Sequence, residues 1–329
     1  MARAVRIHQT GGPEQLQVEE IDVPAPGPGE VLLRQTACGV NFIDCYHRSG
    51  LYPLPQLPHG IGVEACGVVE AVGDGVRGVQ TGERMAYATP PPGAYAEARV
   101  LPADRLIPVP DEVEDAVAGG TTLRGLTAWL LLHRTFPVRR GHTLLIHAAA
   151  GGVGQILCQW ADYLGATVIG TVGDEDKAQV AAEHGCHHPI LYTQDDFREK
   201  VEAITGGRGV DVVYDSVGAA TFEASLDCLR PLGMMVSYGN ASGAPPAIEP
   251  GLLAQKGSLF LTRPVLFHYI ADRHELLAGA SAYYDALTQG VIEPAVGRRY
   301  PLEKAARAHT DLEARATTGA TVLDLGAAD

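Results

Sequence analysis

A glycine-rich turn between an apolar segment and a helical segment constrains the fold of this chain more than any other feature. Residues 143–148 form an apolar run suited to a buried strand, and residues 153–164 show the spacing of a helix that ends before a glycine. Gly151, Gly152 and Gly154 lie at the junction. Glycines at such a turn let backbone amides and the positive end of the helix approach a pyrophosphate. We therefore expect a dinucleotide site here; the alternative is an ordinary connecting turn.

Strands and helices continue to alternate after this turn. The expected strands cover residues 143–148, 167–172, 189–192, 210–215 and 233–238, and the expected helices cover residues 153–164, 177–184 and 195–205. This alternation is typical of βαβ units, in which successive parallel strands form one doubly wound sheet. The central part of the chain is therefore expected to be an α/β domain.

The regions on either side of this domain follow other patterns. Short β-branched runs at 31–36 and 67–72 are separated by turns rich in glycine and proline, which indicates a compact β-barrel-like domain. The segments expected after about residue 264 are a helix at 271–289, a strand near Tyr300, a helix at 302–315 and a strand at 321–325. The chain has 329 residues, more than one domain usually holds. We expect residues 125–264 to form one domain, and 1–124 and 265–329 together to form the other.

Composition limits the classes of partner and compartment. The net charge of −14 disfavours binding to a phosphate backbone, and no run of about 18 apolar residues predicts a membrane span. The first residues lack the apolar core of a secretion signal. The cysteines form no C-x-x-C pair and are interpreted as reduced core thiols: Cys38, Cys45, Cys66, Cys158, Cys186 and Cys228. We expect a cytoplasmic protein that binds neither nucleic acid nor membrane.

The end of the second expected strand indicates which nicotinamide cofactor is bound. NAD sites usually place an acidic residue there to hold the ribose hydroxyls, but this strand ends at Gly173 without one. Lys177 follows at a position suited to a 2′-phosphate, and Tyr192 ends the next strand beside it. The acidic residues Asp174 to Asp176 would favour NADH if one turned inward, although acids at a helix start also fit the helix dipole. We expect NADPH.

With these features in view, the chain resembles the zinc-free quinone oxidoreductases (zeta-crystallin-like) of the medium-chain dehydrogenase/reductase superfamily over nearly its whole length. The matching motifs include 11–14, 41–44, 48–53, 147–154, 213–218, 256–259 and 262–264. The resemblance implies an α/β protein with a GroES-like β-rich catalytic domain and a Rossmann doubly wound parallel sheet. It implies NADPH-dependent reduction of quinones. Asp162, where relatives tend to carry a basic residue, is a departure, as is the acidic triplet after Gly173.

The zinc alcohol dehydrogenases of the same superfamily provide a contrast. Their ligand cysteine corresponds to Asn41 here, and their ligand histidine to Val63, so the chain lacks a zinc ligand set at these positions. Residues 86–100 contain no cysteine, and the four-cysteine structural-zinc lobe is therefore missing. A stray metal site formed by His59 and nearby cysteines is an alternative that we disfavour. We predict that the protein binds no zinc.

The resemblance also implies the site residues. Catalytic roles fall to Asn41, Tyr46, Tyr52 and Arg263. Cofactor contacts fall to Phe42, Ile43, Asp44, Tyr46, Leu130, Gly151, Gly152, Val153, Gly154, Gly173, Lys177, Tyr192, Ser216, Tyr238, Gly239, Asn240 and Arg315. The residues from Asn41 to Tyr46 would line the nicotinamide end of the cleft.

Several of these residues also have a plainer interpretation. Asn41 either donates to a quinone carbonyl or is a turn residue that bonds its own backbone. Tyr52 either covers the pocket mouth or only packs in its loop. Arg263 binds a substrate oxygen or the cofactor, or forms a structural salt bridge. Arg315 reaches the adenosine end of the cofactor or complements a helix dipole. His147 is interpreted as a satisfied buried histidine.

No nucleophile–base triad is evident, and quinone reduction requires none because the cofactor carries the chemistry. The first competing function is reduction of α,β-unsaturated aldehydes or ketones with NADPH. The second is a non-enzymatic role, as a crystallin-like NADPH-binding protein or an RNA-binding protein; the third, zinc alcohol dehydrogenase, is disfavoured by Asn41 and Val63. The resemblance further implies a homodimer in which residues 256–261 pair across a two-fold axis.

Overall fold

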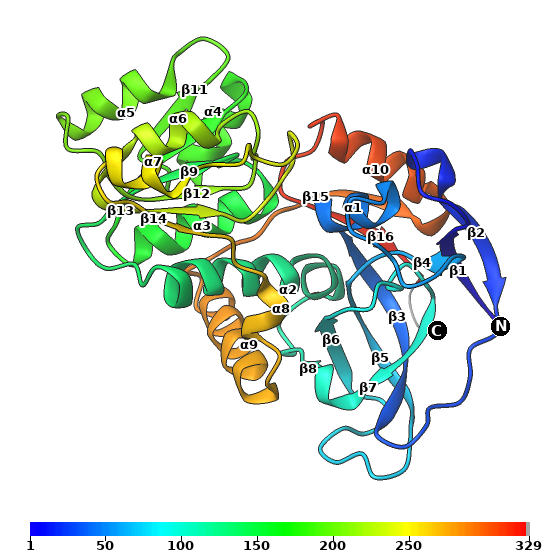
Figure 1. The fold of residues 1–329 in the computed structure, drawn as a ribbon. Helices are drawn as coiled ribbons and strands as arrows, with labels where there is room; N and C mark the ends of the chain where they lie inside the picture. The colour runs from blue at the N-terminus through cyan, green and yellow to red at the C-terminus, as the bar shows by residue number, and fades with distance from the viewer. Residues whose placement is uncertain (327–329) are drawn as a thin grey trace. The chain divides into compact units, whose positions relative to one another are not determined.

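The computed structural model describes residues 1–326, which divide into two compact units (Figure 1). Unit 1 contains Met1–Leu123, Ile270–Thr288 and the chain from Pro294 onward, and unit 2 contains Arg124–Tyr269 and Gln289–Glu293. The expected boundaries differ from these by one residue at the first junction and by five at the second. The return of Gln289–Glu293 to unit 2 is not expected from the sequence; within that unit the Glu293 backbone N–H donates to Gln159 Oε1 over 2.8 Å, and Ile292 is fully buried.

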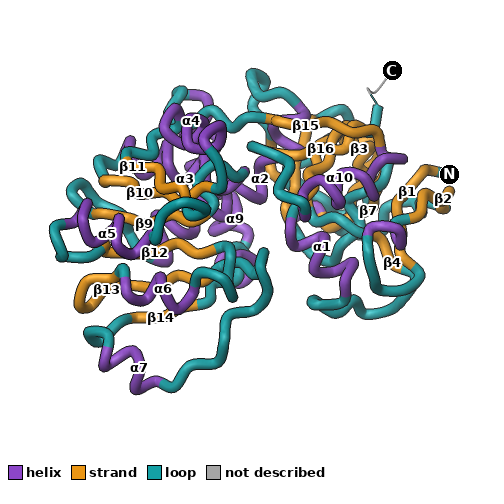
Figure 2. Tube along the Cα trace, turned by 90° about the horizontal axis from the view of Figure 1, so that it is seen from above, coloured by secondary structure: helices purple, strands orange, loops and turns teal. Residues whose placement is uncertain are grey.

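Unit 2 is built around one parallel sheet of six strands, in the order β11-β10-β9-β12-β13-β14 (Figure 2). Its strands are β9 (Thr143–His147), β10 (Thr167–Val172), β11 (His188–Leu191), β12 (Val210–Asp215), β13 (Leu229–Ser237) and β14 (Phe260–Thr262). Its helices are α3 (Gly152–Tyr163), α4 (Glu175–Glu183), α5 (Phe197–Thr205), α6 (Phe222–Asp227), α7 (Pro250–Gln255) and α8 (Leu266–Tyr269). This strand order, with helices in the connections, is that of a doubly wound dinucleotide-binding sheet, as predicted.

The sheet of unit 2 forms because its central strands are apolar enough to be covered on both faces. All six residues of β12 are buried, and Leu145, Val213 and Met235 belong to one core cluster. The expected fifth strand, 233–238, is longer in the structure, because β13 pairs Leu229 with Val210 and then Met234 with Val212 around a bulge. β14 forms one edge of the sheet.

Unit 1 is rich in β-structure. A seven-stranded sheet has the order β15-β16-β3-β5-β6-β8, with β7 paired to β3, and a three-stranded sheet has the order β2-β1-β4. The strands are β1 (Ala2–Ile7), β2 (Gln17–Ile21), β3 (Glu30–Val40), β4 (His59–Gly60), β5 (Glu64–Val72), β6 (Arg84–Ala88), β7 (Ala98–Pro102), β8 (Ile107–Pro108), β15 (Val296–Pro301) and β16 (Ala320–Asp324). The segments after residue 264 thus complete the sheet that the N-terminal segments begin.

The helices of unit 1 are α1 (Phe42–Ser49), α9 (Arg273–Thr288) and α10 (Ala305–Glu313), and α2 (Asp115–Trp129) begins in it. The helix expected at 302–315 is a short 3₁₀ turn (Leu302–Lys304) followed by α10. The unit packs around a core that includes Ile7, Leu33 and Leu101. Among residues 1–326, no helix is both long and apolar enough to cross a membrane.

Candidate functional site

The glycine loop of unit 2 joins β9 to α3. Gly151 is the N-cap of α3, and its N–H donates to the carbonyl of Ala148 over 2.9 Å. A Cβ at Gly154 would lie 2.3 Å from the Ala148 oxygen and 2.6 Å from the Ala149 oxygen. The backbone is therefore packed too closely for any side chain at Gly154. The loop leaves the first backbone N–H groups of α3 without helical partners of their own, which is the geometry that binds a phosphate anion.

Buried polar side chains form hydrogen bonds next to this loop. His147, at the end of β9, is fully buried; its Nδ1 lies 2.8 Å from Thr171 Oγ1 and its Nε2 lies 2.8 Å from Ser225 Oγ. Burial lowers the pKa of His147, so the ring is neutral. The interpretation of His147 as a satisfied buried histidine is confirmed. Gln155 Nε2 donates to the Ala150 carbonyl over 2.9 Å, a support that the sequence analysis missed.

The carboxyl ends of β10 and β11 bring together the residues expected at a 2′-phosphate. A Cβ at Gly173 would lie 3.0 Å from the Tyr192 hydroxyl, so these residues are neighbours. Asp174 is the N-cap of α4 and accepts the Lys177 backbone N–H over 2.8 Å, while its other oxygen lies 3.0 Å from Lys177 Nζ. The Lys177 backbone and ammonium lower the pKa of Asp174. The first acid of the triplet therefore caps the helix and pairs with the lysine.

The carboxyl ends of β12 and β13 hold a second group of predicted residues. A Cβ at Gly239 would lie 2.3 Å from the Ser216 carbonyl oxygen, and the Tyr238 N–H donates to the Asp215 carbonyl over 2.8 Å. Asn240 follows directly, half-buried. Arg263, just after β14, donates from its guanidinium to the Ser237 carbonyl over 2.8 Å. These residues lie at the sheet edge where doubly wound folds bind ligands.

Leu130, Val153, Ile43 and Arg315 occupy different local settings. Leu130 is buried at the start of a π-helical segment (Leu130–Thr135) that continues α2, a feature often found at functional sites. Val153 is half-buried in the first turn of α3, and Ile43 is half-buried in the first turn of α1. Arg315 is exposed just after α10 with a positive φ of 58°.

In unit 1, the first turn of α1 positions Asn41. Its backbone N–H donates to Asp44 Oδ2 over 2.8 Å, and its side-chain Nδ2 donates to Glu64 Oε1 over 2.7 Å. The second Glu64 oxygen accepts the Leu123 backbone N–H over 2.7 Å, and Glu64 is fully buried. Gly39 permits this arrangement, because a Cβ there would lie 2.1 Å from the Glu64 carboxylate. The Asn41 amide is therefore clamped by a carboxylate from β5.

Aromatic side chains gather beside this turn. Tyr46 and Tyr52 lie edge to face with ring centroids 5.2 Å apart, and Phe42 lies 6.3 Å from Tyr46. The Tyr52 N–H donates to the Tyr46 carbonyl over 3.0 Å, and the ring centroids of His47 and Tyr52 lie 5.8 Å apart. Burial lowers the pKa of His47. The structure thus brings together three of the predicted aromatic residues on α1 and the loop that follows it.

The positions that correspond to zinc ligands carry no metal-binding arrangement. Val63 is fully buried, and the Asn41 side chain donates a hydrogen bond to Glu64. All six cysteines are buried free thiols, and burial raises the pKa of Cys45 and Cys66. Among residues 1–326, no three His, Cys, Asp or Glu side chains lie close enough to hold a metal ion.

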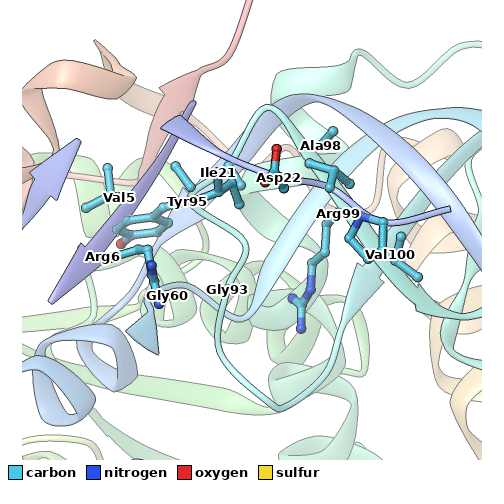
Figure 3. A pocket seen from close by; sticks show the side chains of 14 residues that line it. Val5, Arg6, Ile21, Asp22, Gly60, Gly93, Tyr95, Ala98, Arg99 and Val100 are labelled. Carbon is cyan, nitrogen blue, oxygen red and sulfur yellow. The ribbon is translucent and has the colours of Figure 1, made fainter. Parts of the chain in front are cut away.

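A separate hollow of about 270 Å³ opens on unit 1 (Figure 3). It is lined by β1, the segment after β2 and the stretch from Gly93 to Val100, with the Tyr95 ring and the Arg99 side chain in its wall. The Arg99 guanidinium donates to the Tyr87 hydroxyl and to the Pro91 carbonyl. None of the predicted site residues lines this hollow.

Known proteins resemble this chain along nearly its whole length. The family described as alcohol dehydrogenase GroES-like domain matches residues 27–111, and that described as zinc-binding dehydrogenase matches residues 152–271. A 2-haloacrylate reductase from Burkholderia is 50% identical over 98% of this chain and 99% of that protein. A quinone oxidoreductase from Pseudomonas aeruginosa is 47% identical over 98% and 99%. The structure of Escherichia coli quinone oxidoreductase complexed with NADPH matches with a TM-score of 0.96 and 46% identity, over 98% of this chain and 100% of that one.

Proposed function

This chain belongs to the quinone oxidoreductases of the medium-chain dehydrogenase/reductase superfamily, and we propose that it reduces quinones with NADPH by hydride transfer. When bound, NADPH supplies the hydride, and the protein orients it against the acceptor and excludes competing reactions. The family is supported by quinone oxidoreductases 46–47% identical over 98% of the chain.

The glycine loop carries the cofactor assignment. At Gly154 the backbone leaves no room for a Cβ, as a pyrophosphate site at a helix start requires. The end of β10 has Gly173 where an NAD site would have an acid, and Lys177 follows. Because Lys177 already pairs with Asp174, we infer that a 2′-phosphate would share this lysine with the carboxylate. The residues present therefore fit NADPH.

Unit 1 supplies the proposed substrate residues. The clamped Asn41 amide offers one further N–H for a substrate carbonyl, beyond the one that Glu64 accepts. Tyr46 and Tyr52 provide flat apolar surfaces with hydroxyl groups, which suits a planar quinone. We propose Asn41 as a substrate contact and Tyr52 as one source of the proton, with solvent as the other. Asn41→Leu should lower turnover at least tenfold, because it removes the proposed substrate donor and also the N–H that Oε1 of the buried Glu64 accepts.

The function is tested by steady-state turnover with 1,4-benzoquinone and larger quinones, with NADPH and with NADH. We expect quinone-dependent oxidation of NADPH, and a higher kcat/KM with NADPH than with NADH. An enzyme that oxidised neither cofactor in the presence of any quinone would contradict the proposal.

Reduction of an activated alkene is the second candidate, because a 2-haloacrylate reductase is 50% identical to this chain. Such a reaction adds hydride to one alkene carbon and a proton to the other, whereas quinone reduction places its protons on oxygen. The kcat/KM values for 2-chloroacrylate and 1,4-benzoquinone, measured with NADPH under matched conditions, separate the two functions. A much higher value for the acrylate would make alkene reduction the main activity.

We propose that the protein forms a homodimer through β14. This strand lies at the edge of the six-stranded sheet, and Phe260, Leu261 and Leu232 are exposed near it. An exposed apolar edge strand favours pairing with a second copy. Light scattering should show a dimer, and Leu261→Asp should yield monomers. A monomeric wild-type protein at micromolar concentration would contradict this proposal.

We also place the enzyme in the cytoplasm. The six cysteines are all free thiols, a pattern that favours a reducing compartment. Fractionation of cells that express the protein at its natural level tests this placement, and recovery in an oxidising compartment would contradict it.

A further inference from the structure

A line of buried hydrogen bonds in unit 1 connects α10 with the first turn of α1. His309 on α10 lies 2.9 Å from an Arg48 guanidinium nitrogen through Nδ1, and 3.0 Å from the Tyr95 hydroxyl through Nε2. The Tyr95 hydroxyl lies 2.9 Å from Asp44 Oδ2, the same oxygen that accepts the Asn41 backbone N–H. The line therefore ends at the residue that we propose contacts the substrate.

Arg48 sets the direction of every bond in this line. A guanidinium has only N–H donors, so His309 Nδ1 must accept from it. A neutral imidazole then carries its proton on Nε2, and this N–H donates to the Tyr95 oxygen. The Tyr95 O–H in turn donates to the Asp44 carboxylate, which can only accept when ionised. No member of the line can reverse without losing a bond.

Burial keeps the line in this single protonation state. His309 is fully buried, and this burial, followed by repulsion from the positive charge of Arg48, lowers the pKa of His309 to about 3. Burial and the neighbouring Asp44 raise the pKa of Tyr95 well above its usual value. The Cys45 thiol also faces the ring, 3.5 Å from Nδ1. At neutral pH the donors and acceptors are therefore fixed.

Arg48 also fastens the line at its far end. Its Nε donates to the Gly11 carbonyl over 3.1 Å, and its second terminal nitrogen pairs with Glu313 at 2.7 Å. The guanidinium thus joins α1, the turn at Gly11 and α10. Because Arg48 and Asp44 both belong to α1, the line holds this helix at its first and its last turn.

We propose that His309 and Tyr95 are positioning residues for hydride transfer, which hold the first turn of α1 so that Asn41 meets the substrate in a productive geometry. This inference rests on the proposed role of Asn41. His309 and Tyr95 act through Asp44 and need not touch substrate or cofactor. A displacement of about 1 Å at a reacting group costs on the order of 100-fold in rate, so the loss of such support should reduce kcat.

The test compares four variants. His309→Leu removes the acceptor and the donor together, whereas His309→Gln keeps both on one planar amide. Tyr95→Phe removes only the hydroxyl that reaches Asp44, and serves where His309→Leu fails to fold. Tyr87→Phe is the matched control: Tyr87 is also fully buried in unit 1, but its hydroxyl donates to Gln35 Oε1 over 2.5 Å and accepts from Arg99.

The readouts are kcat, the KM for the acceptor, the Kd of NADPH and the thermal unfolding midpoint. We expect His309→Leu and Tyr95→Phe to lose roughly 10- to 100-fold in kcat with little change in NADPH affinity. His309→Gln should retain most of the turnover. Tyr87→Phe should lose stability without losing kcat.

Three results would overturn the inference. These are wild-type kcat in folded His309→Leu and Tyr95→Phe, equal losses of kcat in His309→Leu and His309→Gln, or an equal loss of kcat in Tyr87→Phe. Each variant is compared with wild type on whichever acceptor wild type reduces, 1,4-benzoquinone or 2-chloroacrylate. Failure of the quinone assignment would therefore appear as the absence of quinone turnover in the wild-type protein. Failure of the positioning role would appear only in the ratio of each variant's kcat to that of wild type.

Discussion

The glycine loop of unit 2 and the first turn of α1 in unit 1 are built in opposite ways. The loop is local: Gly154 packs against carbonyls only a few residues away, and its function depends on side chains that are absent. The α1 turn depends on side chains from distant parts of the chain, since Glu64 lies 23 residues from Asn41 and His309 lies 214 residues from Tyr95. The first kind of site is visible in a short motif, and the second only once the chain has folded.

The largest expected effect is the loss of NADPH binding when a single methyl group is added to the glycine loop. Gly154→Ala places a Cβ within 2.6 Å of two backbone oxygens that cannot move independently, and the loop must then shift. We expect NADPH to bind at least about 100-fold more weakly, a loss of roughly 2.7 kcal/mol. Fluorescence titration with NADPH measures this effect.

Gly251→Ala is the control for that variant, because nothing lies within 4 Å of a Cβ at this helical position. Its NADPH affinity and unfolding midpoint should match those of wild type. Unchanged NADPH affinity in Gly154→Ala would show that the loop does not cradle the cofactor.

The 2′-phosphate residues should show a smaller and cofactor-specific effect. A charge-assisted hydrogen bond contributes roughly 1.5–3 kcal/mol, so Lys177→Ala should weaken NADPH about 10- to 150-fold and leave NADH nearly unchanged. Asp174→Asn keeps an oxygen for the helix cap and removes the charge that competes for Lys177 Nζ. It should tighten NADPH binding by roughly 2- to 5-fold.

Lys200→Ala is the matched control, since Lys200 is an exposed lysine paired at 3.2 Å with Asp195 in the same unit. It should alter neither cofactor's affinity. Equal losses of NADPH and NADH in Lys177→Ala would make Lys177 a structural residue. A wild-type preference for NADH would indicate that an acid between Asp174 and Asp176 binds the ribose hydroxyls instead.

Most of unit 2 could be predicted because its signals are local. β10 and β12 have the predicted bounds, since each is a continuous apolar run between turn residues. β13 was expected too late in the chain, because Arg230 to Gly233 resemble a turn but form a bulge within the strand. The π-helical segment that holds Leu130 has no composition of its own and was missed.

Unit 1 was less predictable because its contacts join residues that are distant in the sequence. In β2 the apolar Val18 is exposed while the charged Glu19 is half-buried, so its sequence has no clear apolar face. The resemblance predicts Asn41, Tyr46 and Tyr52 as site residues, and the structure places them at the N-cap of α1, within α1 and in the loop that follows it. No local signal marked Glu64 as the partner of Asn41, or His309 as the partner of Tyr95.

Acid should reveal the buried imidazole as a loss of stability. Unfolded His309 takes up a proton below its ordinary pKa of 6.5, whereas in the folded protein this pKa is about 3. The unfolded state therefore binds more protons between these values, and stability falls as pH decreases from about 6.5 towards 3. At pH 5 the protonation of His309 in the unfolded state lowers the free energy of unfolding by roughly 2 kcal/mol.

His309→Gln should remove that part of the pH dependence, measured by urea unfolding at pH 7 and pH 5. A residual slope of the same sign should remain, because burial also lowers the pKa of His147. His274→Gln, at a histidine whose side chain is 87% exposed, is the control and should change nothing. An unaltered pH dependence in His309→Gln would show that His309 is not buried as a neutral base.

Tyr52→Phe should have the smallest effect on quinone turnover. Quinone reduction delivers protons to oxygen, and solvent can supply them, so we expect a loss of about twofold or less, well below 1.4 kcal/mol. Alkene reduction delivers a proton to carbon, where a positioned acid contributes roughly 100-fold or more. Turnover of Tyr52→Phe with 1,4-benzoquinone and with 2-chloroacrylate therefore sharpens the contrast between the two candidate activities. A large loss with the quinone would make Tyr52 its required proton donor.

The most direct test of metal-free quinone reduction compares turnover of a quinone with oxidation of an alcohol after dialysis against a strong chelator. Alcohol oxidation requires removal of a hydroxyl proton, which zinc assists by stabilising the alkoxide, and Asn41 and Val63 stand where the zinc ligands would be. 1,4-benzoquinone is offered with NADPH, and benzyl alcohol with NADP⁺, to the same chelated protein. We predict undiminished turnover of the quinone and none of the alcohol. Robust oxidation of the alcohol alongside an inert quinone would contradict it.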